Sequence, residues 1–276
     1  MGVRVLLLIV LGGWIGLALA MTAAWIAERR TGNSGWIDVT WTFAVGGAGI
    51  ILALAAFLSM KTSSMRILVV AGLVALWALR LGLHLVWRTR RINDDPRYAK
   101  MKTEMGAQVG FGMFKLAQAQ ALVSIPLVIS IALAAWSPAP WRSQDILAVI
   151  VFLIAIAGEA AADRQLRAFR AKPENRDRFC DEGLWRWSRH PNYFFEWLGW
   201  LAFPLFAVTL SDDYPIGWLA FVGAFSMYWL LTRVSGIPPL EAHMRAKYGD
   251  SFERYMARTS AFFPWFPAKP FERGAT

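Results

Sequence analysis

Hydrophobic residues occur along the chain in long uncharged runs, which are separated by short polar connections and by longer basic segments. No charged residue lies in 5–27, 39–60 or 116–141. Each of these runs is long enough to cross about 30 Å of hydrocarbon as an α-helix. The pattern predicts an all-α polytopic membrane protein with seven transmembrane helices, at roughly residues 5–27, 36–60, 67–88, 114–136, 145–163, 193–211 and 214–233.

The basic residues set the expected orientation. Of the 29 lysine and arginine residues, 24 fall on one side of the predicted helices, in 88–115, 164–192, the tail from residue 233, and Arg29 and Arg30. Cytoplasmic segments of membrane proteins are enriched in these residues. We therefore expect the N-terminus outside and the C-terminus in the cytoplasm, in an integral protein of a bacterial inner membrane.

The amino-acid composition of the chain excludes several classes of protein and of site. Charged residues make up 17% of the chain, against about a quarter in soluble domains. The single cysteine, Cys180, excludes an internal disulfide and a multi-cysteine metal site. The three histidines show no two-histidine metal spacing, so we expect no metal. The net charge of +10 suits an anionic cofactor or lipid, and we expect no nucleic acid and no obligatory protein partner.

A signal peptide is the alternative interpretation of the first hydrophobic run. Arg4 precedes it, and Ala18 and Ala20 resemble a cleavage site. The run continues past these residues to Ala27, which makes it a full-length span. We expect it to be retained as the first helix.

Acidic and basic residues meet at the end of the fifth hydrophobic segment. Glu159, Asp163 and Arg167 are spaced i, i+4 and i+8, with Arg164 and Arg170 beside them. Carboxylates at membrane depth are costly unless they face a polar cavity or a partner. The spacing predicts a functional helix face; a ladder of charges at a helix end is the alternative.

The stretch LWRWSRHPNYFFEWLGW, residues 184–200, places polar side chains before the sixth segment. Pro191 suits the first turn of a helix. Free backbone N–H groups there, together with Arg186 and Arg189, would attract an anion such as phosphate. Asn192 and Glu196 share one helix face. Anchoring at the membrane interface is the alternative, and it explains the tryptophans but not these two polar residues.

Helix three and the tail contain further polar candidates. Arg80, His84 and Arg88 are spaced i, i+4 and i+8 in helix three, with Asp38 of helix two as a possible partner. We expect a short amphipathic helix at roughly Leu240–Met256. Its polar residues would lie under the basic loops, although charged tails are usually only solvated.

Residues 162–197, ADRQLRAFRAKPENRDRFCDEGLWRWSRHPNYFFEW, resemble the bacterial branch of the steroid 5α-reductase family. The resemblance continues weakly through DPRY at 95–98 and KYG…FERY at 247–255. It implies an enzyme that uses NADPH to reduce the C4=C5 double bond of a 3-oxo-Δ4 steroid to the 5α-3-oxosteroid. The substrate, a steroid or another enone lipid, would enter from the bilayer, and membrane lipids would surround the protein.

On this interpretation residues 1–276 form a single reductase domain, with the cofactor half at approximately 114–276. The family's cofactor residues match Arg164, Arg167, Asn192 and Tyr255, and Glu196 follows the asparagine. Together with the polar residues around them, the predicted cofactor-binding residues are Asp163, Arg164, Arg167, Arg170, Arg186, Arg189, His190, Asn192, Tyr193, Glu196, Glu241, His243, Tyr248 and Tyr255.

The chain departs from the family where the catalytic acid is expected. Animal members use a Gln-Glu pair in helix two and a tyrosine in helix three. Here helix two offers only Asp38, and the helix-three position beside His84 is Leu85. The candidate acids are therefore Asp38, His84 and Tyr98, which we expect in a loop. The tail has GIPPLEAH where sterol reductases have an arginine-aspartate pair. The resemblance therefore does not identify the residues that would contact the adenine.

Two other interpretations compete with a reductase. Membrane methyltransferases resembling isoprenylcysteine carboxyl methyltransferases share an R-H-P-x-Y motif, here Arg189–Tyr193, and use S-adenosylmethionine. That cofactor has no phosphate, so the basic segment 164–192 favours NADPH. A non-enzymatic protein that binds sterols or lipids, or a small transporter, is the other alternative. Transporters usually show repeats and broken helices near the midplane, and the sequence has no evident repeat.

Overall fold

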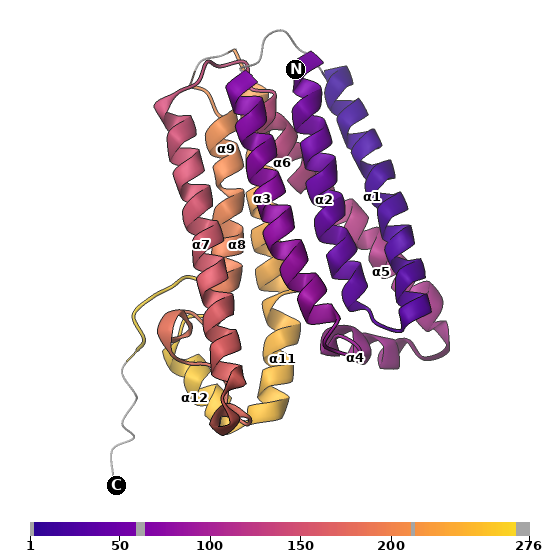
Figure 1. Ribbon diagram of the computed structural model, residues 1–276, viewed down its shortest axis with the longest axis vertical. Helices are drawn as coiled ribbons and strands as arrows, with labels where there is room; N and C mark the ends of the chain where they lie inside the picture. The colour runs from indigo at the N-terminus through magenta and orange to yellow at the C-terminus, as the bar shows by residue number, and fades with distance from the viewer. Residues whose placement is uncertain (1–2, 59–63, 211–212, 269–276) are drawn as a thin grey trace. The chain divides into compact units, whose positions relative to one another are not determined.

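The computed structural model describes residues 3–58, 64–210 and 213–268, and these residues contain helices but no β-strand. The all-helical prediction is confirmed. The α-helices are α1 (Val3–Thr31), α2 (Gly35–Ala55), α3 (Ser64–Thr89), α4 (Pro96–Met105), α5 (Val109–Val123), α6 (Ile125–Ala135), α7 (Ser143–Ala171), α8 (Pro191–Trp200), α9 (Ala202–Ala207), α10 (Phe221–Trp229), α11 (Ile237–Tyr248) and α12 (Asp250–Arg258) (Figure 1).

Six helical stretches in the described part of the chain are long and apolar enough to cross a membrane. They are Leu7–Thr31, Gly35–Leu58, Ser64–Thr89, Arg97–Ala135, Ser143–Ala171 and Pro215–Tyr248. The sixth predicted segment, 193–211, is divided between α8 and α9. Proline has no N–H to donate to the carbonyl four residues before it. Pro204 therefore cannot continue the hydrogen bonding of α8 at Trp200, where that helix ends.

The chain divides into two compact units. The first consists of Met1–Ile150 and Leu201–Ser226, and the second of Val151–Trp200 and Met227–Thr276. Helix α7 thus begins in the first unit and ends in the second. All of the predicted cofactor-binding residues belong to the second unit, whereas the three candidate acids belong to the first.

In the first unit, α2 and α3 pack closely through small residues (Figure 1). A Cβ atom at Gly46 would lie 2.4 Å from the Cβ of Ala78, and one at Gly82 would lie 2.4 Å from the ring of Phe43. Both distances are too short for real atoms. Glycine at these positions allows the two helices to approach closely. Close packing is needed because the hydrophobic effect does not drive helices together within a lipid bilayer.

A fully buried ion pair connects two helix starts in the first unit. Arg66 of α3 donates from Nη2 to Oδ2 of Asp145 in α7, at 2.7 Å, and both side chains have no exposed surface. The guanidinium also donates to the carbonyl oxygens of Ser137, at 3.1 Å, of Ala139, and of Pro140, at 2.7 Å. Because these bonds satisfy the buried charges, the pair fixes the start of α3 to the loop before α7.

The basic segment 88–115 contains a helix that the hydrophobic pattern did not show. Asp95 precedes α4 and its carboxylate accepts a hydrogen bond from the backbone N–H of Arg97, at 3.0 Å. Pro96 occupies the first helical position, where a missing N–H costs nothing. The loop expected at Tyr98 is therefore wrong, because capping by Asp95 starts a helix there.

In the second unit, α7 and α8 pack against each other where α7 has no side chain. A Cβ atom at Gly158 would lie 2.4 Å from the ring of Phe195. The single helix expected at Leu240–Met256 is also wrong, because α11 and α12 are separate helices. Gly249 lies between them with φ +51°, a conformation that favours glycine and ends α11.

The segment after α12 returns along the residues that precede α8. The backbone N–H of Arg189 donates to the carbonyl of Ser260, at 2.8 Å, and that of Trp265 donates to the carbonyl of Trp187, at 2.9 Å. The hydroxyl of Ser188 donates to the carbonyl of Phe262, at 2.9 Å. These bonds hold the aromatic FFPWFP run against the start of α8.

Candidate functional site

A partly buried polar cluster in the first unit contains two of the predicted acids. The hydroxyl of Tyr98 in α4 donates to Oδ1 of Asp38 in the first turn of α2, at 2.7 Å. The side-chain amide of Gln120 in α5 donates to the same hydroxyl oxygen, at 2.9 Å. Tyr98 is only 5% exposed. The structure therefore joins three helices through one phenol.

Arginine side chains surround the carboxylate of this cluster. Arg97 donates to Oδ2 of Asp38, at 2.6 Å, and Nη2 of Arg88 lies 3.7 Å from the same oxygen. Both guanidinium groups also contact Asp95, at 2.8 Å and 2.6 Å. Burial of Asp95 opposes its ionisation, but the hydrogen bond from Arg97 and the charges of Arg97 and Arg88 outweigh burial, so its pKa lies below the ordinary value.

Gln120 has an unused hydrogen-bonding atom beside the phenol. Its Oε1 is buried, and no described residue donates a hydrogen bond to it. Buried acceptors are nearly always satisfied by protein, water or a ligand. The cluster therefore has a free acceptor next to a phenol donor.

The third candidate acid, His84, lies on α3 in the same unit. His84 is half-buried on α3, and its ring centroid lies 6.5 Å from that of Trp87. Sequence reasoning missed Gln120 and Arg97 as members of the cluster. The available signal for Gln120 was a polar side chain inside the uncharged run 116–141, and for Arg97 its position directly after an Asp-Asp-Pro cap.

The second unit has a buried charge cluster at the start of α8. Nε of Arg189 donates to Oε1 of Glu241 in α11, at 2.8 Å, and Nε2 of His190 lies 3.0 Å from the same oxygen. Nη1 of Arg189 also donates to the carbonyls of Met256, at 3.1 Å, and Thr259. Arg189, predicted to bind a phosphate, thus caps the last turn of α12 with its side chain.

His190 is held neutral in this cluster. Burial lowers its pKa and the charge of Arg189 lowers it further, against the opposing effect of Glu241. A neutral imidazole that donates from Nε2 keeps Nδ1 as an acceptor. Nδ1 is buried and accepts no hydrogen bond from the residues that the structure describes. It is therefore available to a donor group such as a hydroxyl or an amide.

The predicted polar faces of α7 and α8 meet beside His190. Nδ2 of Asn192 lies 3.4 Å from Oδ1 of Asp163, and the ring of Tyr193 stacks on that of His190 with centroids 5.4 Å apart. Glu196 is buried and accepts a hydrogen bond from Nε1 of Trp200, at 2.9 Å. The arginines of this α7 face are exposed to solvent: Arg164, Arg167 and Arg170.

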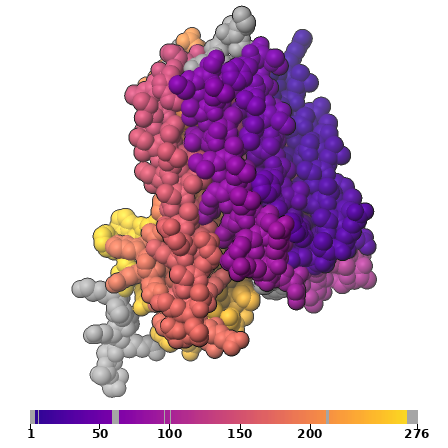
Figure 2. Space-filling view, in the orientation of Figure 1, coloured from indigo at the N-terminus to yellow at the C-terminus, as the bar shows by residue number. Residues whose placement is uncertain are grey.

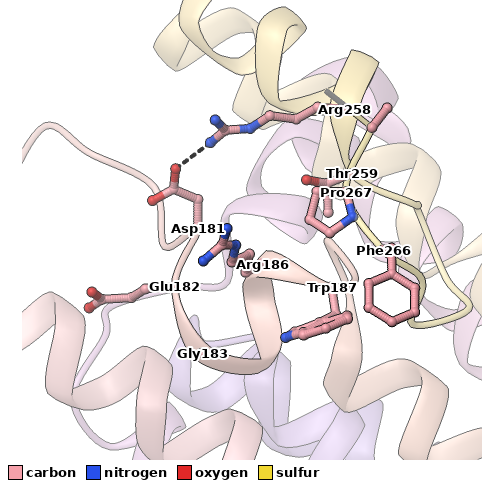
Figure 3. Close-up of a pocket in the computed structure, with 10 residues that line it drawn as sticks. Asp181, Glu182, Gly183, Arg186, Trp187, Arg258, Thr259, Phe266 and Pro267 are labelled. Carbon is pink, nitrogen blue, oxygen red and sulfur yellow. Dashed lines mark hydrogen bonds and ion pairs between the residues drawn. The ribbon is translucent and has the colours of Figure 1, made fainter. Parts of the chain in front are cut away.

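The tail candidates lie in different surroundings. The hydroxyl of Tyr255 is buried and donates to the carbonyl of Trp185, and burial raises its pKa above the ordinary value. Tyr248 donates to the carbonyl of Arg178, at 3.3 Å. His243 is exposed on α11. Arg186 lines a surface pocket together with Trp187 and with Phe266 of the tail (Figure 3).

The residues around the start of α8 could hold an anionic group. The first N–H groups of a helix have no partner within it and attract phosphate. Exposed arginines on α7 supply positive charge, and the amide of Asn192 and Nδ1 of His190 supply a donor and an acceptor for ribose or amide groups. The described residues contain no group of three or more His, Cys, Asp and Glu side chains that could hold a metal ion.

Replacing His190 by glutamine should reduce the loss of stability in mild acid. The folded protein holds this imidazole neutral, whereas an unfolded histidine binds a proton as pH falls below about 6.5. Protonation therefore favours the unfolded state, and wild-type stability should fall between pH 7.5 and pH 5.5. The check is the unfolding temperature in detergent at both values.

His243→Gln is the matched control, because His243 is exposed in the same unit. It should keep the wild-type dependence on pH. If His190→Gln kept it as well, the neutral imidazole would not be a determinant of stability.

Comparison with known proteins gives a family and one relative. The family model described as "Protein of unknown function (DUF1295)" matches residues 24–259. An uncharacterized protein of Schizosaccharomyces pombe is 24% identical over 282 residues, which cover 91% of this chain and 79% of the yeast protein. No solved structure matches the chain at a comparable level.

Proposed function

The chain belongs to the DUF1295 family of proteins of unknown function, and we propose that it is a membrane reductase that uses NADPH. Its reaction is reduction of the C4=C5 double bond of 3-oxo-Δ4 steroids to 5α-3-oxosteroids. The observation that carries this proposal is the hydrogen-bonded set of Tyr98, Asp38 and Gln120, in which the phenol is buried. Such a phenol is suited to bind a ketone oxygen, which is the group that must gain charge during enone reduction.

Tyr98 would act by turning its hydroxyl from Asp38 to the substrate carbonyl. Gln120 holds the phenol oxygen in place from the other side. Asp38 would keep Arg97 and Arg88 as partners after the hydroxyl turned away, so its charge would stay compensated. A hydrogen bond to the carbonyl oxygen stabilises the enolate that forms there, before a proton reaches the α-carbon.

The residues proposed to hold the cofactor are those around the start of α8. Asn192, Tyr193 and His190 lie beside the arginines of α7, whose charges suit the phosphates of a dinucleotide. When bound, NADPH supplies the hydride for the β-carbon of the enone. Asp163 would orient the amide of Asn192 toward the ligand, since their side chains lie 3.4 Å apart.

We also propose that α8 and α9 together make a seventh membrane crossing. The stretch 191–207 contains one charged residue, Glu196, and a broken helix can cross where neighbouring helices satisfy its backbone. An odd number of crossings then places the N-terminus outside and the basic tail in the cytoplasm, as the distribution of arginines favours. The localisation that follows is a bacterial inner membrane, with the steroid arriving from the bilayer.

The test is product analysis with the purified protein. NADPH and progesterone should give NADPH oxidation and a 5α-reduced product, identified by mass spectrometry against a standard. A fluorescence titration should show binding of NADPH and no response to S-adenosylmethionine. Binding of S-adenosylmethionine alone would favour a methyltransferase. No turnover with several enones, together with no NADPH binding, would favour a protein that only binds lipid.

A further inference from the structure

An open pocket of about 780 Å³ lies in the second unit, on the surface beside the start of α8 (Figure 3). One wall is the segment from Asp181 to Trp187, which precedes α8. The other wall is the end of α12 at Arg258 and the returning tail at Phe266. Arg186 was predicted to bind the cofactor, but Asn192, Tyr193, His190 and the arginines of α7, which are proposed above to hold NADPH, do not line this pocket. A ligand of this pocket can be identified without any reductase activity.

The charged groups of the pocket are balanced but only partly paired. Arg258 and Asp181 form an ion pair at 2.6 Å. Arg186 and Glu182 also line the pocket, and within the described part of the chain neither side chain makes a hydrogen bond or an ion pair. Figure 3 shows the carboxylate of Glu182 pointing away from Arg186. The pocket therefore offers one separate cation and one separate anion to a ligand.

Exposed aromatic side chains form the other side of the pocket. The rings of Trp187 and Phe266 meet edge to face, with centroids 4.9 Å apart, and Phe266 is 73% exposed. Trp265, the next residue, is 69% exposed. They lie outside the six long apolar helices, close to the start of α8. Large aromatic residues in such places favour the membrane interface, where headgroups and acyl chains meet.

The tail forms this wall before any ligand binds. The backbone N–H of Trp265 donates to the carbonyl of Trp187, and that of Ala268 donates to the carbonyl of Arg258, at 2.8 Å. Bonds at both ends of the segment keep Phe266 over Trp187. A ligand would therefore lose little affinity to ordering the pocket.

We propose that this pocket binds the headgroup of a zwitterionic phospholipid such as phosphatidylethanolamine. The phosphate contacts Arg186, whose planar guanidinium suits phosphate oxygens. The ammonium group contacts the carboxylate of Glu182, which has no cation of its own among the described residues. The acyl chains follow Phe266 and Trp265 into the bilayer. An anionic lipid fits less well, because its headgroup leaves Glu182 without a cation.

Native mass spectrometry of the full chain, released from detergent with added lipid, tests this assignment. Wild-type protein should retain one phosphatidylethanolamine in preference to phosphatidylglycerol. Arg186→Gln should reduce retention roughly tenfold, as expected for loss of one charge-assisted contact. Glu182→Gln should remove the preference between the two lipids. Arg254→Gln and Glu174→Gln, which change exposed charges elsewhere in the same unit, should behave as wild type.

Three results would overturn the proposal. Equal retention by Arg186→Gln and Arg254→Gln would show that the pocket does not hold the phosphate. Equal retention of both lipids by the wild type would show that the ammonium group is not recognised. Displacement of the retained lipid by NADPH, with weaker NADPH binding in Arg186→Gln, would assign the pocket to the nucleotide. None of these results depends on whether the protein reduces a steroid.

Discussion

Tyr98→Phe should lower the turnover of a 3-oxo-Δ4 steroid by ~10²–10³-fold, the usual effect of removing one donor to a developing oxyanion. Phenylalanine keeps the ring in the interior of the first unit but removes the hydroxyl that joins Asp38 to Gln120. Binding of NADPH should not change, because the proposed cofactor residues lie in the second unit. The measurements are the rate of product formation and a fluorescence titration with NADPH.

Tyr214→Phe is the matched control for this experiment. Tyr214 is a buried tyrosine of the same unit, and its hydroxyl donates to the carbonyl of Leu133, at 3.1 Å, away from the proposed site. It should lose stability but keep turnover within a few-fold of wild type. If Tyr98→Phe retained a comparable rate, the phenol would not polarise the ketone, and Asp38 or His84 would have to be reconsidered as the acid.

Arg66→Ala should destabilise the protein by about 3–5 kcal/mol, the expected cost of removing one partner of a buried ion pair. Asp145 would keep a charge with no exposed surface, with only the more distant guanidinium of Arg142, at 3.6 Å, as a charged partner among the described residues. Three carbonyl groups of the preceding loop would also lose their donor. The effect should be visible as a much lower unfolding temperature in detergent, or as failure to recover folded protein.

Removing both charges distinguishes the loss of the pair from the cost of an isolated charge. Arg66→Met combined with Asp145→Leu should recover a substantial part of the lost stability, because apolar residues of similar size often replace a buried pair at little cost. Arg4→Ala, at an exposed arginine near the start of α1, should have almost no effect. An Arg66→Ala protein as stable as Arg4→Ala would contradict the role assigned to this clamp.

In the candidate sites, local sequence patterns predicted positions along a helix but not the contacts between helices. The i, i+4 spacing correctly placed Asp163 on a polar face of α7, and Pro191 correctly marked the start of α8. The same reasoning assigned Arg189 to a phosphate. In the structure this side chain contacts Glu241 and the last carbonyls of α12, which are more than 50 residues away in sequence. Spacing along one helix does not indicate what approaches it from another.

The sequence by itself determined the class of protein: an all-helical chain with long apolar helices and basic segments between them. This follows because the length of an uncharged run and the position of its charges are local properties, and the energetic cost of placing charge in hydrocarbon acts on each segment separately. The tertiary structure alone decided which polar groups share a site. Tyr98 and Asp38 are 60 residues apart. They meet because Asp95 caps the start of α4, and Arg97 and Tyr98 of that helix then contact Asp38 of α2. Such contacts depend on which helix faces meet, and that is fixed by the close packing of many side chains together rather than by any one stretch of sequence.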